Sequence, residues 1–317
     1  MSTTWPPRQI PFLPEELKIA ASEGNLAIFI GAGVSRLVGC PSWGEFADSA
    51  LKQLADKDII NFSDIQQLSH LDAKKRLSIA SQIANTEGFQ LDYQKLIEPQ
   101  VPTNSQIYSY LNRIGCIYIT TNYDLYLDYP TYSYTLPDSS SFVPQSGKKL
   151  KELICRPDQF KRLALRTPGN IVHLHGSIKE RESMIITTVD YLEHYRNEYV
   201  VNFLEELFGH YTVLFIGYGL EEAEILEHVL RKGKLNIDKT LRRRFMLQGF
   251  YSHQQRTFEH LHNYYSRTFG VYICHFSLDY LNHAQLEKIV DDWSQNLKVG
   301  EPLLADDLKA ILEAADE

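Results

Sequence analysis

Residues 26–35 read LAIFIGAGVS, five apolar residues followed by Gly31-Ala32-Gly33, which ends the run. A short run that is apolar throughout predicts a strand buried on both faces of its sheet. Similar runs follow along the chain, with helical periodicity between them, at residues 116–120, 171–174, 211–216, 241–247 and 271–276. Strands that alternate with helices indicate βαβ crossovers. We therefore predict an α/β fold, a Rossmann-like doubly wound and mostly parallel sheet.

Several segments between these runs have helical periodicity. A capping-box spacing, Ser42 to Glu45, predicts a helix start at Ser42. The other helices are expected at residues 15–23, 191–208, 221–231, 253–267 and 283–297. The polar stretch 56–112 is predicted to be a helical insertion within one catalytic domain, residues 1–300. Residues 137–149 are expected to form a surface loop, and residues 301–317 an acidic C-terminal helix or tail.

Composition excludes several classes of protein. The 317 residues include 32 Lys+Arg and 40 Asp+Glu, a net charge of −8, which argues against a generic nucleic-acid binder. The chain has no signal-peptide pattern and no apolar run of the roughly 20 residues that span a bilayer. Its four cysteines form no CxxC pair, so we expect buried free thiols, no zinc and a cytoplasmic protein with no membrane contact.

Ligands of a doubly wound sheet bind beyond the carboxyl ends of the strands, so the residues just after each strand are informative. After the first strand, Gly31 and Gly33 would let the backbone approach a phosphate, and Ser35 offers a hydroxyl. Arg36 occupies the position where a full GxGxxG motif needs a third glycine. A tight structural turn and a nucleotide cradle are about equally good interpretations of this segment.

The next two strands also end in polar residues. Thr120-Thr121-Asn122-Tyr123-Asp124 supplies hydrogen-bonding side chains, although a turn with Asx hydrogen bonds is, for these residues alone, the favoured interpretation of Asn122 and Asp124. His173-Leu174-His175-Gly176-Ser177 places both histidines on one face by strand alternation. His175 lies at the strand end and is the better candidate for a general base, since the usual pKa of histidine lies near neutrality.

A fourth strand end, Gly217-Tyr218-Gly219, again permits close backbone approach. Glu221, Glu222 and Glu224 follow it, and favourable interaction with a helix N-terminus is the simplest reason for their position.

The ordered set GAGVS, TNYD, HLHGS and a late glycine-bearing strand end resembles the sirtuin family, particularly the bacterial sirtuin-like NAD hydrolases of antiphage defence. The resemblance extends from about Leu26 to Glu224 and implies NAD+ as substrate. It implies catalytic roles for His175 as general base and for Asn122 and Asp124 on the nicotinamide-ribose side. The implied cofactor-binding residues are Gly31, Ala32, Gly33, Ser35, Thr121, Gly217 and Gly219.

The sequence departs from the family at two places. No cysteine lies between Gly176 and Gly217, so the zinc module with two CxxC pairs, found in sirtuin deacylases, is missing. Without the module that helps to build the acyl-lysine cleft, water is a better acceptor than an acetyl oxygen, and the expected reaction is hydrolysis of NAD+ to nicotinamide and ADP-ribose. The family's Gly-Thr-Ser is replaced by Gly217-Tyr218-Gly219, which changes the expected contacts with the adenosine ribose.

Alternatives remain open at this point. These are an NAD-dependent protein deacylase, a non-catalytic module that senses NAD or ADP-ribose, and an ordinary Rossmann dehydrogenase. A constitutive NAD hydrolase would harm its host, and 317 residues leave little length for a regulator. We therefore expect a homo-oligomer, and the resemblance implies a HerA-like ATPase/helicase partner that supplies any contact with nucleic acid.

Overall fold

The structure is a computed structural model that describes residues 5–99, 103–129, 153–219, 225 and 243–300. Its six-stranded sheet has the order β3-β2-β1-β4-β5-β6, and every neighbouring pair is parallel. The strands are β1 (Leu26–Ile30), β2 (Ile117–Thr120), β3 (Ile171–His173), β4 (Thr212–Ile216), β5 (Arg244–Phe250) and β6 (Val271–Ser277). This is the dinucleotide-binding order of doubly wound sheets, which confirms the predicted fold class.

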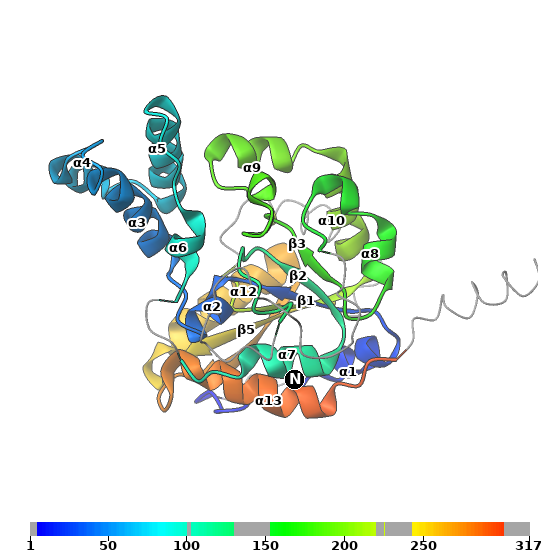
Figure 1. The fold of residues 1–317 in the computed structure, drawn as a ribbon. Coiled ribbons are helices and arrows are strands. Elements are labelled where there is room, and N and C mark those ends of the chain that lie inside the picture. The colour runs from blue at the N-terminus through cyan, green and yellow to red at the C-terminus, as the bar shows by residue number, and fades with distance from the viewer. Residues whose placement is uncertain (1–4, 100–102, 130–152, 220–224, 226–242, 301–317) are drawn as a thin grey trace, which may run out of the picture.

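Both faces of the sheet are covered by helices (Figure 1). One hydrophobic core joins the sheet to α1 (Glu15–Ser22), α2 (Ala32–Leu37), α7 (Ile107–Ile114) and α13 (Gln285–Asn296). The other core joins it to α8 (Arg162–Arg166), α10 (Glu198–His210) and α12 (Gln255–Phe269). Every residue of β1, β2 and β4 is buried, as expected for strands covered on both sides.

Four further helices surround a third, smaller core: α3 (Trp43–Ala55), α4 (Phe62–Leu68), α5 (Ala73–Thr86) and α6 (Tyr93–Ile97). Figure 1 shows α3, α4 and α5 standing apart from the sheet. Packing thus places α3 with this helical group and α7 with the sheet, whereas the sequence analysis placed the insertion at residues 56–112. The division of the chain into domains stays a prediction.

Other expected boundaries shift by a few residues. The capping box at Ser42 and Glu45 is present, and it starts α3 as predicted. The helix expected at residues 191–208 is two helices, α9 (Thr188–His194) and α10, because the chain turns at residues 195–197 and Asn197 caps α10. The strand expected at 241–247 is described from Arg244 to Phe250.

Four short 3₁₀ turns complete the elements, at Pro157–Gln159, Arg181–Ser183, Ser252–Gln254 and Asn282–Ala284. All four cysteines are buried and free, which confirms that expectation. Across the described part of the chain, no helix is long and apolar enough to cross a membrane. The loop expected at 137–149, the acidic segment 301–317, the glutamates 221, 222 and 224, and most of the helix expected at 221–231 lie outside the described residues.

Candidate functional site

The strand order reverses between β1 and β4, where a doubly wound sheet opens its ligand crevice. The glycines of both strand ends meet here: the amide of Gly33 donates to the carbonyl oxygen of Gly217 at 2.8 Å. A Cβ on Gly31 would lie 2.6 Å from that oxygen, and one on Gly33 2.8 Å from it. These glycines are therefore required for contact between two strand ends, whether or not a phosphate also binds.

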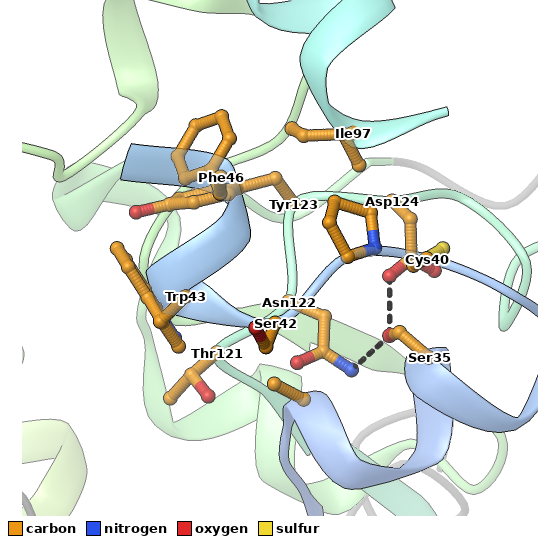
Figure 2. Close-up of a pocket in the computed structure, with 12 residues that line it drawn as sticks. Ser35, Cys40, Ser42, Trp43, Phe46, Ile97, Thr121, Asn122, Tyr123 and Asp124 are labelled. Carbon is orange, nitrogen blue, oxygen red and sulfur yellow. Dashed lines mark hydrogen bonds between the residues drawn. The ribbon is translucent and has the colours of Figure 1, made fainter. Parts of the chain in front are cut away.

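The Ser35 hydroxyl is the centre of a buried polar cluster that joins α2, α7 and the end of β2. It donates to Oδ2 of Asp124 at 2.6 Å and accepts from Nδ2 of Asn122 at 2.7 Å. The Tyr108 hydroxyl lies 2.9 Å from it, and because the single Ser35 proton goes to Asp124, Tyr108 is the donor. Figure 2 shows Ser35 between Asn122 and Asp124. The structure thus brings together three residues that the sequence placed at two separate strand ends.

Burial sets the electrostatics of this cluster. Ser35, Asn122 and Asp124 are each less than a tenth exposed. Desolvation raises the pKa of Asp124 above its usual value, although the Ser35 hydrogen bond opposes that shift. Burial also raises the pKa of Tyr108 well above its usual range, so its hydroxyl stays protonated. The cluster therefore has one proton-accepting carboxyl group surrounded by neutral donors.

Sequence reasoning missed Tyr108. It lies in α7, whose other buried positions are apolar, so its spacing is that of an ordinary hydrophobic stripe. Its hydroxyl reaches Ser35 and lies 3.4 Å from Oδ1 of Asp124. No local pattern distinguishes such a tyrosine from an ordinary core residue.

A small cavity lies beside this cluster, between the sheet and the helical group (Figure 2). Its lining comprises Ala32, Ser35, Cys40, Pro41, Ser42, Trp43, Phe46, Ile97, Thr121, Asn122, Tyr123 and Asp124. The cavity measures about 50 Å³, room for one or two waters, whereas small-molecule sites typically measure about 300–1,000 Å³. In this conformation the cavity is too small to hold a whole dinucleotide, which would need the lining to move apart.

His175 lies outside this cavity lining and is fully buried. Its Nε2 is 2.7 Å from the Tyr195 hydroxyl and its Nδ1 is 3.4 Å from that of Tyr191. Desolvation lowers the pKa of His175 well below its usual value, and the charges of His194 and Lys74 lower it further. His175 is therefore neutral at neutral pH, as a general base must be.

The strand alternation that predicts His173 and His175 on one face stops at His173, and the two rings contact different partners. The strand ends at His173, and the chain turns at Gly176, whose φ is +84°. A Cβ on Gly176 would lie 2.1 Å from the carbonyl oxygen of Ser183, which explains the glycine after His175. His173 instead contacts the loop that follows β2.

The remaining predicted residues are distributed around this crevice. Ala32 and Thr121 line the cavity with Ser35. Gly217 contacts the backbone of α2, as above, and Gly219 is exposed, its carbonyl oxygen accepting from the Tyr265 hydroxyl at 3.3 Å. Within the described residues, no group of three His, Cys, Asp or Glu side chains is placed to hold a metal ion.

Comparisons with known proteins agree with this geometry. Residues 117–266, from β2 to α12, match a family described as a SIR2-like domain. Defense-associated sirtuin 2 of Bacillus subtilis is 24% identical over 216 residues, which cover 67% of this chain and 19% of that protein. The chain thus spans about a fifth of the length of that curated relative. Asn122, Asp124 and His175 lie in the region that is similar to SIR2-like domains, on an α/β sheet of the Rossmann type.

Proposed function

We propose that this chain hydrolyses NAD+ to nicotinamide and ADP-ribose. The observation that carries the proposal is the buried Ser35–Asn122–Asp124 cluster beside the β1–β4 crevice. Dinucleotides bind at that point of a doubly wound sheet, and SIR2-like domains use NAD+. The similarity of residues 117–266 to that family supports the same substrate.

The reaction needs a water held against C1′ of the ribose and a group to take its proton. As the bond from C1′ to the nicotinamide nitrogen breaks, the bonding electrons leave with neutral nicotinamide and positive charge develops on the sugar. Water adds to C1′ and releases one proton, which His175 accepts. Asn122 orients the water, and Asp124 anchors the nicotinamide ribose or its carboxamide.

Ligand binding in the β1–β4 crevice is assigned to backbone and small side chains. Gly31, Ala32, Gly33, Ser35 and Thr121 hold the pyrophosphate and the neighbouring ribose, and Gly217 and Gly219 line the adenosine side. Every proposed step uses side chains of this chain, and we assign no zinc to the site.

The proposal includes an opening of the site. The cavity of about 50 Å³ and the burial of His175 mean that NAD+ reaches neither in the described conformation. We assign this opening to assembly of the chain into a homo-oligomer that a HerA-like ATPase/helicase partner controls in the cytoplasm. The assembled enzyme would deplete NAD+ in antiviral defence. The similarity to Defense-associated sirtuin 2 of Bacillus subtilis supports the defence role.

The test is to incubate the purified chain with NAD+, alone and with the partner, and to quantify nicotinamide and ADP-ribose by chromatography. Asn122→Ala and His175→Ala should each abolish nicotinamide release while circular dichroism stays unchanged. Ser294→Ala, a buried serine of α13 far from the crevice, is the matched control. Turnover by both site variants at the wild-type rate would refute the assignment. Saturable ADP-ribose binding without nicotinamide release would instead support a sensing module, and consumption of an acetylated peptide would support a deacylase.

A further inference from the structure

His173 is a buried histidine that the proposed reaction does not use. Its side chain is fully buried at the end of β3. Nε2 lies 3.0 Å from Oδ2 of Asp128, and Nδ1 lies 3.3 Å from the backbone carbonyl oxygen of Asn122. Both ring nitrogens therefore face oxygens of the loop that follows β2.

The two partners determine the protonation state of this ring. A carbonyl oxygen and an ionised carboxylate only accept hydrogen bonds, so both ring nitrogens must donate, and only the imidazolium has two N–H groups. Burial alone disfavours this cation, but the charge and hydrogen bond of Asp128, the Asn122 carbonyl and the charge of Asp124 outweigh burial and raise the pKa of His173. Geometry and electrostatics agree on a charged His173.

The Asn122 carbonyl that His173 holds belongs to the residue whose side chain enters the site. Nδ2 of Asn122 donates to Ser35 at 2.7 Å and to the Gly31 carbonyl oxygen at 3.1 Å. The backbone is also held on either side of this carbonyl. Before it, the amide of Asn122 donates to Oγ1 of Thr120. After it, the carbonyl of Tyr123 accepts from the amide of Ile178. A displacement of the backbone at Asn122 would move the Cα that carries this side chain, so the bond from His173 to the Asn122 carbonyl helps to hold the side chain in place.

We propose that the His173–Asp128 pair is a positioning device that holds the Asn122 peptide so that its side-chain amide points into the site. Its catalytic consequence rests on the proposed function of Asn122. Neither residue lines the cavity, so the pair acts through its neighbours, by the hydrogen bond to the Asn122 carbonyl and by the charge that His173 presents to Asp124. The Asp128 carboxylate stabilises the positively charged His173 ring, and the Nδ1–H of that ring donates a hydrogen bond to the Asn122 carbonyl oxygen.

The first test measures the pair without any activity. In protein labelled with ¹⁵N-histidine, long-range ¹H–¹⁵N spectra at pH 7.5 distinguish imidazolium from neutral rings, and His173→Gln identifies the signal by its loss. We expect a doubly protonated His173 in the wild type, a shift toward the neutral ring in Asp128→Asn, and a displaced Asn122 side-chain amide in the same variant. A neutral His173 in the wild type would overturn the proposal, as would an Asn122 amide unmoved by Asp128→Asn.

The second test separates kcat from KM. A misplacement of about 1 Å can cost about 100-fold in rate, so Asp128→Asn and His173→Leu should lower kcat by about 10- to 100-fold and change KM by less than about threefold. His173→Gln keeps one side-chain N–H donor and should restore part of kcat. The control is Asp291→Asn, which breaks the Arg113–Asp291 pair on another part of the surface and should leave both constants unchanged.

The two levels of the proposal fail in different ways. Wild-type kcat in both Asp128→Asn and His173→Leu would remove the positioning role while the NAD hydrolase assignment stands. Absence of nicotinamide release by the wild type, with or without the partner, would remove the proposed function, and the spectra would then decide whether the pair holds the Asn122 peptide.

Discussion

Replacing Ser35 with alanine removes the atom on which the buried cluster converges. The hydroxyl bonds to the Asp124 carboxyl at 2.6 Å, to the Asn122 amide at 2.7 Å and to the Tyr108 hydroxyl at 2.9 Å. A hydrogen bond to a charged group contributes about 1.5–3 kcal/mol and a neutral one about 0.5–1.5 kcal/mol. The simple sum is about 2.5–6 kcal/mol.

Two partners keep other hydrogen bonds, which places the expected loss near the lower end of that range. Asp124 retains the amide of Tyr126 at 3.2 Å, and Asn122 retains the carbonyl of Gly31 at 3.1 Å. We expect Ser35→Ala to lower the free energy of unfolding by about 3 kcal/mol. Much of this loss reflects buried polar groups left short of a partner.

Urea unfolding followed by circular dichroism measures this loss, with Ser294→Ala as the matched control. Ser294 is as buried as Ser35, each at 4% exposure, but its hydroxyl makes a local bond to the Asp291 carbonyl and accepts from Arg113 on the molecular surface. The control should lose less, about 1–2 kcal/mol, because Arg113 is half exposed to water and keeps Asp291 as a partner. Equal losses in the two variants, at unchanged m-values, would refute the idea that Ser35 joins three elements.

Three further predictions follow from single positions. Gly217 has a φ of +61°, and the Cβ of Gly217→Ala would lie 2.6 Å from a backbone nitrogen of α2, so this variant should lower the free energy of unfolding by about 2–5 kcal/mol. Gly115→Ala is the control, because Gly115 has a φ of +71° and nothing within 4 Å of the added Cβ. It should lower the free energy of unfolding by about 1 kcal/mol in the same urea experiment. Burial lowers the pKa of His194 to about 4 in the folded protein. Between pH 6.5 and 4 the unfolded chain therefore binds one more proton at this residue than the folded protein does, and the free energy of unfolding falls as the pH drops. At pH 5 the loss relative to pH 7.5 should be about 2 kcal/mol. Urea titrations at pH 7.5 and 5 should show a smaller fall in His194→Phe than in the wild type. Trp43 lines the small cavity beside the Ser35 cluster, so binding of ADP-ribose there should change the tryptophan fluorescence of the wild type. The same change in Trp43→Phe would contradict an opening at this cavity.

The fold could be predicted from the sequence because its strands are apolar on both faces. Short runs that are apolar throughout indicate strands buried on both faces of a sheet, and the helical segments between them provide the crossovers that a parallel sheet needs. The start of α3 was equally predictable, since the Ser42–Glu45 capping box is a local hydrogen-bonding pattern. The break between α9 and α10 was not predicted, because the apolar periodicity continues across the turn at residues 195–197.

The site was predictable only in part, for a related reason. Polar residues after strands identified Ser35, Asn122 and Asp124, and parallel strands bring such residues to one edge of the sheet. Tyr108 reaches them through tertiary packing of α7, which leaves no mark on its local sequence. The sequence also allowed a phosphate as the reason for Gly31, whereas the structure adds a steric reason, since a Cβ there would meet Gly217 and Tyr218, which follow β4.

The surroundings of the two histidines differ in a way that bears on the roles proposed for them. A general base needs a nitrogen lone pair in the neutral ring. His173 faces an acceptor at each nitrogen, so it could take a proton from water only after losing one of its two hydrogen bonds. His175 is kept neutral by burial and by the positive charge of Lys74, and its Nε2 faces a hydroxyl that can turn to either donate or accept. Two residues apart in sequence, one ring holds an N–H toward the Asn122 carbonyl and the other keeps a lone pair, as the roles proposed for them require.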